Sequence, residues 1–399
     1  MGYLIVKKVL FLIHTLGAGG AEKVLINLVN NLDQSKYDIT LMTVIDTGIF
    51  KQDIAKGIKY KTIFKLPHGN AKKSEEKSGS LHENYSCIKA IMKKSYTVFW
   101  RYANCAKIYK HFIKEKYDYE IAFLEGICAK IIASSNNDKS IKYSWVHVDL
   151  LNERKSESFF RNLDEEKKIY GQFNKIVCVS NVVKNSVKQK LGIKEQKLET
   201  LYNIIDSKEI SNKSLDRIEL VKDCLTFVSV GRLSNQKGYD RLIDAATKLK
   251  KENAKFKIYI IGEGPEKKNL ESQIEKNNMS DVIYLLGFKK NPYVYMNFAD
   301  VFICSSRAEG FSTVASEAVV LGKPCIVTDC SGMRELFGEE GQYGFITENS
   351  TEGIYDGMDK FIKNNKMLAE YAERAKEGAK RFDVNIALKT IERNLLDDF

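Results

Sequence analysis

The sequence predicts an α/β protein with two lobes, each a parallel sheet wound with helices on both faces. The chain has 399 residues, roughly twice the usual size of one domain. Short apolar, β-branched runs alternate with helical patterns along its length, as is typical of parallel sheets. A polar stretch without a clear period, residues 204–223, interrupts this alternation and indicates a linker.

In the first half, short apolar runs are predicted to be strands and the segments between them helices. The strands are expected at Lys8–His14, Tyr37–Val44, Ile58–Phe64, Asp118–Leu124, Lys142–His147, Lys175–Ser180 and Leu198–Tyr202. The helices are expected at Ala21–Leu32, Tyr85–Lys116, Ile127–Ser134, Glu157–Tyr170 and Asn181–Leu191. This part, residues 1–205, is interpreted as the N-terminal lobe, followed by a linker at 206–223.

In the second half, the same alternation restarts. Strands are expected at Cys224–Val230, Lys255–Gly262, Val282–Gly287, Val301–Ser305, Pro324–Asp329 and Tyr343–Ile346. Helices are expected at Asp240–Glu252, Glu266–Asn277, Thr313–Leu321 and Thr351–Asn364. We interpret residues 224–380 as the C-terminal lobe and expect residues 381–399 to form a helix that crosses back onto the first lobe, with a central cleft between the lobes.

Composition excludes several classes of protein. With 44% hydrophobic and 29% charged residues, the chain is expected to be a soluble globular protein. The apolar run Val9–Ile13 is far shorter than the ~18 residues that cross a bilayer, and it leads into a glycine loop, so we interpret it as a buried strand rather than a secretory signal. The eight cysteines form no Cys-x-x-Cys pair, so neither a zinc site nor a disulfide framework is expected. Scattered free cysteines of this kind fit a protein of the reducing cytoplasm.

Basic charge is concentrated in one segment. The formal net charge is +11, and residues 71–116 hold eleven basic against four acidic residues. Within Tyr85–Lys116, Tyr96, Phe99, Trp100 and Tyr102 lie beside cations, a combination that suits an anionic membrane surface, where each cation adds ~1 kcal/mol. Two alternatives stay open: a lysine bias that only keeps the protein soluble, and aromatic residues that belong to the core. No recognition motif supports binding to nucleic acid.

A glycine loop follows the first predicted strand. Thr15-Leu-Gly-Ala-Gly19-Gly20-Ala-Glu22 runs directly into a helical pattern, so backbone N–H groups could meet a phosphate at the helix N-terminus. The third glycine of a dinucleotide fingerprint is missing. A tight turn without a ligand is an equal alternative.

Two cations follow the first strand of the second half. The strand ends in Gly231, Arg232 follows at once, and Lys237 stands five residues later, just ahead of a helix. At the carboxyl end of a parallel strand, such cations face the crevice where open α/β sheets bind ligands, and they could neutralise a diphosphate. The alternative is a pair of ordinary solvated loop cations.

Two glutamates, separated by seven residues, form the strongest pattern. Glu309 lies in the loop after a predicted strand, and Glu317 lies in the second turn of the next helix. The N–H groups of Phe311, Ser312 and Thr313 at the helix start are suited to an anion. Carboxylates beside them make sense if they accept hydrogen bonds from sugar hydroxyls, whereas a solvated helix face is the default alternative.

Taken together, these motifs resemble the retaining glycosyltransferases of the GT-B fold, in glycosyltransferase family 4 (glycosyl transferases group 1). The resemblance covers essentially the whole chain. It rests on the order and spacing of segments that are each modest alone: Gly19-Gly-Ala-Glu22, Trp145-Val-His147, Val230-Gly-Arg-Leu233 with Lys237-Gly238, Ile261-Gly-Glu-Gly-Pro265, Leu286-Gly-Phe288 and the Glu309 to Glu317 block.

The resemblance implies a role for each matching residue. Arg232 and Lys237, after Gly231, would bind the diphosphate of a nucleotide-sugar, and Glu317 its ribose hydroxyls. Glu309 would contact the transferred sugar, helped by backbone groups of Gly310, Phe311, Ser312 and Thr313. From the other lobe, the glycine loop would approach the diphosphate or the sugar, and His147 would lie near the reacting carbon. The glycine-loop residues matched in this way are Gly19 and Gly20. Gly262, Glu263 and Gly264, with Phe288 beyond them, lie where the family holds the nucleobase, largely by backbone contacts.

The expected chemistry follows from charge. The departing nucleotide diphosphate gains negative charge as the sugar becomes oxocarbenium-like. The chain has no Asp-x-Asp pair to hold a metal, so two cations and the helix N-termini are predicted to stabilise the leaving group without a metal or other cofactor. The resemblance implies retention of anomeric configuration by same-face attack, in which the leaving phosphate takes the acceptor proton. His147 is interpreted as a positioning residue, with a general base and a structural histidine as alternatives.

The sequence therefore predicts a glycosyltransferase that moves a sugar from a nucleotide diphosphate-sugar, with UDP-sugar favoured, to a glycan acceptor. The acceptor is expected to be lipid-linked, the place of work the cytoplasmic face of the cell membrane, and the product a cell-surface polysaccharide or glycoconjugate. Two alternatives stay open: a nucleotide-sugar epimerase of the same fold, and a non-catalytic subunit that binds nucleotide-sugar or membrane. Retention of all four residues Arg232, Lys237, Glu309 and Glu317 argues against the non-catalytic subunit.

Overall fold

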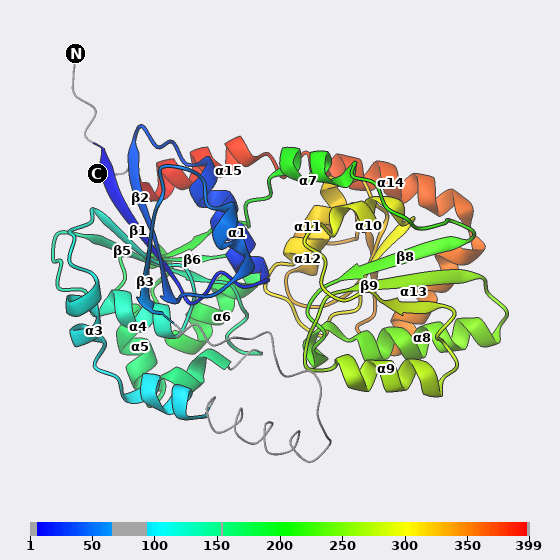
Figure 1. Ribbon diagram of the computed structural model, residues 1–399, viewed down its shortest axis with the longest axis horizontal. Coiled ribbons are helices and arrows are strands. Elements are labelled where there is room, and N and C mark those ends of the chain that lie inside the picture. The colour runs from blue at the N-terminus through cyan, green and yellow to red at the C-terminus, as the bar shows by residue number, and fades with distance from the viewer. Residues whose placement is uncertain (1–5, 66–93, 153–154, 397–399) are drawn as a thin grey trace. The chain divides into compact units, whose positions relative to one another are not determined.

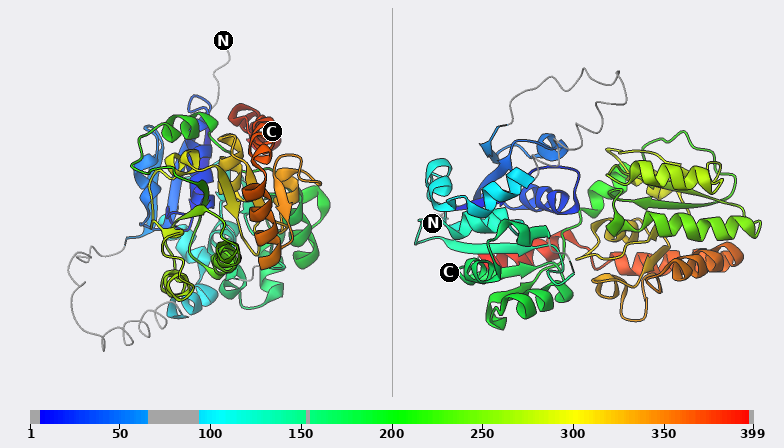
Figure 2. Two further views of the ribbon diagram at one scale, coloured as in Figure 1. Left: turned by 90° about the vertical axis from the view of Figure 1, so that its right-hand side faces the viewer. Right: turned by 90° about the horizontal axis from the view of Figure 1, so that it is seen from below.

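The computed structural model describes residues 6–65, 94–152 and 155–396. The chain divides into two compact units. The first holds the residues up to 179 together with 183–200, and the second holds 180–182 and everything from residue 201 onward. Each unit is a parallel sheet with helices on both of its faces (Figures 1 and 2). The predicted class, two doubly wound α/β lobes, is confirmed.

The first unit is built on a seven-stranded sheet in the order β3-β2-β1-β4-β5-β6-β7. Its strands are β1 (Lys7–Ile13), β2 (Tyr37–Ile45), β3 (Lys59–Phe64), β4 (Tyr119–Ala122), β5 (Ile141–Val146), β6 (Lys175–Cys178) and β7 (Leu198–Thr200). Its helices are α1 (Gly20–Asn31), α3 (Cys105–Phe112), α4 (Ile127–Ala133), α5 (Leu163–Gly171) and α6 (Asn181–Leu191), with short 3₁₀ turns at Ile49–Asp53, Lys155–Phe159 and Glu195–Lys197. Every strand predicted in this half is present.

The second unit is built on a six-stranded sheet in the order β10-β9-β8-β11-β12-β13. Its strands are β8 (Leu225–Val230), β9 (Phe256–Ile261), β10 (Ile283–Leu285), β11 (Val301–Cys304), β12 (Cys325–Thr328) and β13 (Phe345–Thr347). Its helices are α7 (Ser207–Ser214), α8 (Tyr239–Lys251), α9 (Lys267–Lys276), α10 (Tyr293–Phe298), α11 (Thr313–Val320), α12 (Met333–Phe337), α13 (Thr351–Lys363), α14 (Asn365–Ala379) and α15 (Val384–Ile391), which continues into a π-helical turn at Glu392–Leu396. None of the helices in the described ranges is long and apolar enough to cross a membrane.

Strand order explains where ligands can bind. In the second sheet, β8 pairs with β9 on one side and with β11 on the other, all in parallel. The chain therefore reverses its winding direction between β8 and β11, and in open α/β sheets such a reversal is where ligands bind. The predicted diphosphate cations follow β8, and the predicted sugar carboxylate follows β11. Tertiary structure thus brings together two motifs that are about seventy residues apart in sequence.

The helices differ from the predictions in several places. The linker at 206–223 contains α7, which begins after Asp206, whose side chain accepts a hydrogen bond from the Glu209 N–H. At eight residues, α7 is too short to show a period. The short helices α10 and α12 were not predicted for the same reason. The predicted helix Glu157–Tyr170 is a 3₁₀ turn followed by α5, because Asn162 caps the start of α5.

The predicted helix Tyr85–Lys116 is also interrupted. Residues 94–102 are helical, and α3 begins after Asn104, which caps it by accepting from the Lys107 N–H. Residues 85–93 lie outside the described part of the chain. Trp100 is fully buried, whereas Phe99 and Tyr102 are 51% and 68% exposed. The alternative that the aromatic residues belong to the core is therefore correct for Trp100 and wrong for Phe99 and Tyr102, while Tyr96 is half-buried.

Candidate functional site

A buried ion pair joins the two loops at the carboxyl ends of β8 and β11. Lys237 Nζ lies 2.6 Å from Glu309 Oε1, and the Ser306 hydroxyl donates to the same oxygen at 2.6 Å. Burial by itself lowers the pKa of Lys237, but the neighbouring Glu309 carboxylate outweighs it, and the net shift raises the pKa above its usual value. The ammonium group thus stays protonated at any physiological pH.

Only one oxygen of Glu309 is engaged in this way. Its Oε2 accepts no hydrogen bond from any residue that the structure describes. A carboxylate held rigidly through one oxygen can present the other to a hydroxyl group. This geometry suits the contact to a sugar that the sequence predicts for Glu309.

Glu317 projects from the second turn of α11. It is 7% exposed and accepts a hydrogen bond from the Tyr293 hydroxyl at 2.9 Å. The Ser312 side chain caps the helix by accepting a hydrogen bond from the Ala315 N–H. Gly310 and Phe311 lie between Glu309 and this cap, and Thr313 is the first residue of the helix. The N-terminus of α11 therefore lies between the two glutamates along the chain, as the spacing predicts.

Two glycines that follow strands β9 and β8 lie very close to the backbone of a neighbouring loop, which explains why they carry no side chain. Gly262 has φ +149°, and a Cβ there would lie 1.9 Å from the Gly231 carbonyl oxygen. Gly238 has φ +64°, and a Cβ there would lie 2.1 Å from the Ser305 carbonyl oxygen. A side chain at either place would push the loops apart. Glycine is thus needed for the loops to meet, whatever ligand they bind.

The remaining predicted residues of the second unit lie at its surface. Arg232 is exposed and has no ion pair or hydrogen bond to the residues that the structure describes. Phe288 is 44% exposed, and Glu263, next to Gly264, forms an exposed ion pair with Lys267 at 3.0 Å. Arg232 and Phe288 are accessible to a ligand, but their roles stay predictions.

In the first unit, Gly19 caps α1 and Gly20 is its first residue. A Cβ on Gly19 would lie 2.1 Å from Oε2 of Glu22, so this carboxylate folds back over the glycine loop. Glutamate at the third position of a helix commonly reaches back to the cap in this way. Because a carboxylate repels phosphate, its presence favours sugar hydroxyls over a diphosphate as the ligand of this loop.

His147 follows β5 and is half-buried. Its Nε2 lies 3.1 Å from the Phe123 carbonyl oxygen. Since a carbonyl can only accept, Nε2 carries the proton and Nδ1 is left as an acceptor. Burial lowers the pKa of His147 to about 4, despite this hydrogen bond. The imidazole is therefore neutral at pH 7 and a weak base, which agrees better with positioning than with proton abstraction.

Comparison with known proteins gives these features a context. Residues 211–378 match the family model described as "Glycosyl transferases group 1". The match covers less than half of the chain, and the fold of the chain as a whole is the GT-B fold. The fold is supported by Anabaena HepE, solved in complex with UDP and glucose, which is 21% identical and superposes with a TM-score of 0.74 over 98% of this chain and 100% of HepE.

Two relatives differ in how much of this chain they match. One, 38% identical over 197 residues, is the N-acetylgalactosamine-N,N'-diacetylbacillosaminyl-diphospho-undecaprenol 4-alpha-N-acetylgalactosaminyltransferase of Campylobacter jejuni. That match covers 49% of the chain and about half, 52%, of the relative. An uncharacterized glycosyltransferase of Haemophilus influenzae is 24% identical over 93% of the chain and 94% of its own length.

For three residues of the candidate site, sequence reasoning assigned no role. Ser306 and Tyr293 hold Glu309 and Glu317 respectively, and Glu22 covers the glycine loop. Only Glu22 had a signal in the sequence, its place three residues after a helix cap. Ser306 and Tyr293 are ordinary residue types in apolar surroundings, and only the packing shows their partners.

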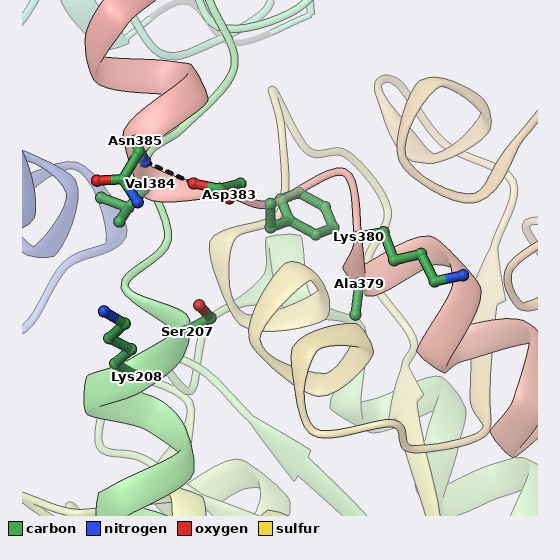
Figure 3. A pocket seen from close by; sticks show the side chains of 8 residues that line it. Ser207, Lys208, Ala379, Lys380, Asp383, Val384 and Asn385 are labelled. Carbon is green, nitrogen blue, oxygen red and sulfur yellow. Dashed lines mark hydrogen bonds between the residues drawn. The ribbon is translucent and has the colours of Figure 1, made fainter.

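A hollow elsewhere in the second unit is a different feature (Figure 3). It is lined by residues at the start of α7 and at the junction of α14 and α15, among them Lys208, Lys380 and Asp383. Asp383 already caps α15 by accepting from the Asn385 and Ile386 N–H groups. None of the predicted site residues lines this hollow, so we do not assign it to the active site.

Proposed function

We propose that this glycosyltransferase moves a sugar from a nucleotide diphosphate-sugar, with UDP-sugar favoured, onto a lipid-linked glycan during synthesis of a cell-surface polysaccharide or glycoconjugate. The observation that carries this proposal is the buried Lys237–Glu309 pair beside the α11 N-terminus. The Campylobacter relative is named for an undecaprenyl-diphosphate-linked acceptor, and HepE was solved with UDP and glucose. Both names support the proposed substrates.

The donor would lie along the carboxyl ends of β8 and β11. Lys237 and the exposed Arg232 would bind the diphosphate, and Glu317 the ribose hydroxyls. The free oxygen of Glu309 would accept from a hydroxyl of the transferred sugar. As the glycosidic bond breaks, the two cations and the α11 N–H groups would stabilise the growing negative charge without a metal ion. Charged groups that are preorganised in a water-poor site can lower the activation free energy of such a step by several kcal/mol.

Retention of configuration would follow from attack on the face that the diphosphate leaves. The acceptor hydroxyl would form the new bond to the anomeric carbon and pass its proton to the departing phosphate. His147 is a weak base, so it would orient a hydroxyl through Nδ1 rather than remove its proton. The acceptor would meet the first unit, where the glycine loop carries Glu22.

A panel of nucleotide-sugars tests this proposal and its rivals together. We expect one donor to raise the melting temperature and to be hydrolysed slowly, and transfer to begin when a polyprenyl-diphosphate-linked sugar is added. EDTA should leave the rate unchanged. A sugar altered without any acceptor would instead identify an epimerase, and binding without turnover a non-catalytic subunit. Activity lost in EDTA and restored by Mg²⁺ would overturn the metal-free mechanism.

We further propose that the enzyme works at the cytoplasmic membrane surface through helix 94–102. Its exposed residues, Lys94, Ser95, Val98, Phe99 and Tyr102, follow one face of the helix. The opposite face carries the fully buried Trp100. Lys130 Nζ holds the C-terminal end of the helix by donating to the Trp100 and Arg101 carbonyl groups, both at 3.0 Å. Apolar side chains on a rigid helix, next to a lysine, suit the interface of an anionic bilayer.

Vesicle co-sedimentation tests this surface. The double variant Phe99→Ala/Tyr102→Ala should bind vesicles of phosphatidylglycerol at least about tenfold more weakly, since two large apolar side chains no longer enter the interface. Leu215→Ala/Val221→Ala is a matched control, because these side chains are 77% and 81% exposed in the second unit. Equal binding by all three proteins would contradict a role for helix 94–102.

A further inference from the structure

The loops that carry Lys237 and Glu309 are joined by more than this ion pair. We call residues 234–240 the lysine loop and residues 305–309 the glutamate loop. The Arg307 N–H donates to the Gln236 carbonyl at 2.7 Å, and Gln236 Nε2 donates to the Ala308 carbonyl at 3.0 Å. The Ser305 hydroxyl donates to the Lys237 carbonyl at 2.9 Å. The two loops are therefore attached to each other along their length.

A second ion pair holds the other end of both loops. The Arg307 guanidinium donates to both carboxylate oxygens of Asp240, at 2.8 and 2.6 Å, and also to the Asn235 carbonyl at 2.7 Å. Arg307 chiefly lowers the pKa of Asp240, which keeps the carboxylate charged. The side chains are 32% and 42% exposed. Ion pairs with this much exposure add little to the free energy of unfolding. A bidentate pair nevertheless fixes the relative orientation of the two side chains.

The two ion pairs have opposite polarity. The lysine loop supplies a cation at Lys237 and an anion at Asp240, whereas the glutamate loop supplies an anion at Glu309 and a cation at Arg307. Sliding one loop along the other would bring like charges together. The arrangement therefore selects one register between the loops, the register in which Lys237 meets Glu309.

Arg241, the next residue in α8, fixes the glutamate loop at another point. Its guanidinium donates to the Ser305 carbonyl at 2.8 Å and to the Asn349 carbonyl at 2.9 Å. Asn349 Nδ2 in turn donates to the Arg307 carbonyl at 3.1 Å. Arg241 and Asn349 thus hold the glutamate loop at the Ser305 and Arg307 carbonyl groups. The Arg307–Asp240 fork adds a side-chain link between this part of the glutamate loop and the lysine loop.

We propose that Arg307 and Asp240 are positioning residues that hold Lys237 and Glu309 in the arrangement that sugar transfer requires. This inference rests on the proposed function. Neither side chain needs to touch the donor. A small displacement of groups that act in a transition state lowers kcat strongly, while ground-state binding of the donor depends on many other contacts.

A double-mutant cycle tests this inference. Arg307→Ala and Asp240→Ala are each expected to lower kcat by about ten- to a hundredfold, with the donor KM changed less than threefold. Since both remove the same fork, the double variant should lose no more than the worse single variant. Arg307→Lys keeps the charge without the fork and should fall between wild type and Arg307→Ala. Arg374→Ala and Glu370→Ala, from an exposed ion pair on α14, are matched controls that should leave kcat unchanged.

A direct structural measurement separates this inference from the proposed function. In crystals of the wild type and of Arg307→Ala, we expect the Lys237 Nζ to Glu309 Oε1 distance to increase from 2.6 Å to beyond hydrogen-bonding range. An unchanged distance, an unchanged kcat or strictly additive losses would overturn the positioning role. A wild-type protein that transfers no sugar from any donor would overturn the proposed function, while the two crystal structures would still decide the positioning role.

Discussion

Lys237→Ala is expected to slow sugar transfer by at least about a hundredfold and to lower the free energy of unfolding by about 3–5 kcal/mol. The loss of rate follows because a fixed cation facing the leaving diphosphate is removed. The loss of stability has a different cause: the Glu309 carboxylate is 9% exposed and would be left charged without its ion-pair partner. Steady-state transfer rates and urea unfolding measure the two effects separately.

Lys267→Ala is the matched control for this variant. Lys267 also pairs with a glutamate of the predicted site, Glu263, but that pair is exposed, with side chains 39% and 48% accessible. An exposed pair contributes at most about 1 kcal/mol, so the unfolding free energy should hardly change. Near-normal turnover by purified Lys237→Ala would remove the diphosphate role of this lysine.

Glu309→Gln is expected to reduce kcat by about a hundredfold at a smaller cost in stability. The amide oxygen of glutamine can still accept from Lys237 Nζ and the Ser306 hydroxyl, so the packing of the loops is kept. What is lost is the negative charge that strengthens a hydrogen bond from the sugar as positive charge develops on it.

Combining the two changes separates stability from catalysis. Lys237→Ala/Glu309→Gln should be more stable than Lys237→Ala, because no buried carboxylate is left without a cation. It should be no more active than either single variant. Urea unfolding and transfer assays on all four proteins provide the measurement. A double variant that recovers activity along with stability would show that the pair is structural only.

Most of the fold could be predicted because its signals are local. Runs such as Val9–Ile13 are buried on both faces of the sheet and are continuously apolar, and the helices between them repeat at helical spacing. Short elements escaped prediction, since α10 and α12 have six and five residues, fewer than two helical turns. The residues at the strand ends, including Arg232, Lys237 and Glu309, could also be found, because their loops break the apolar pattern.

The amino-acid sequence by itself determined the α/β alternation, the parallel strands and the charged residues that follow them. These depend on period and on neighbours along the chain. Only the tertiary structure decided which charges meet: Lys237 with Glu309, Arg307 with Asp240, and the Tyr293 hydroxyl with Glu317. It also decided that Trp100 is buried while Phe99 is exposed. The physical reason is that such partners lie on different elements, and their meeting depends on the side-by-side pairing of β8 and β11, which no local pattern encodes.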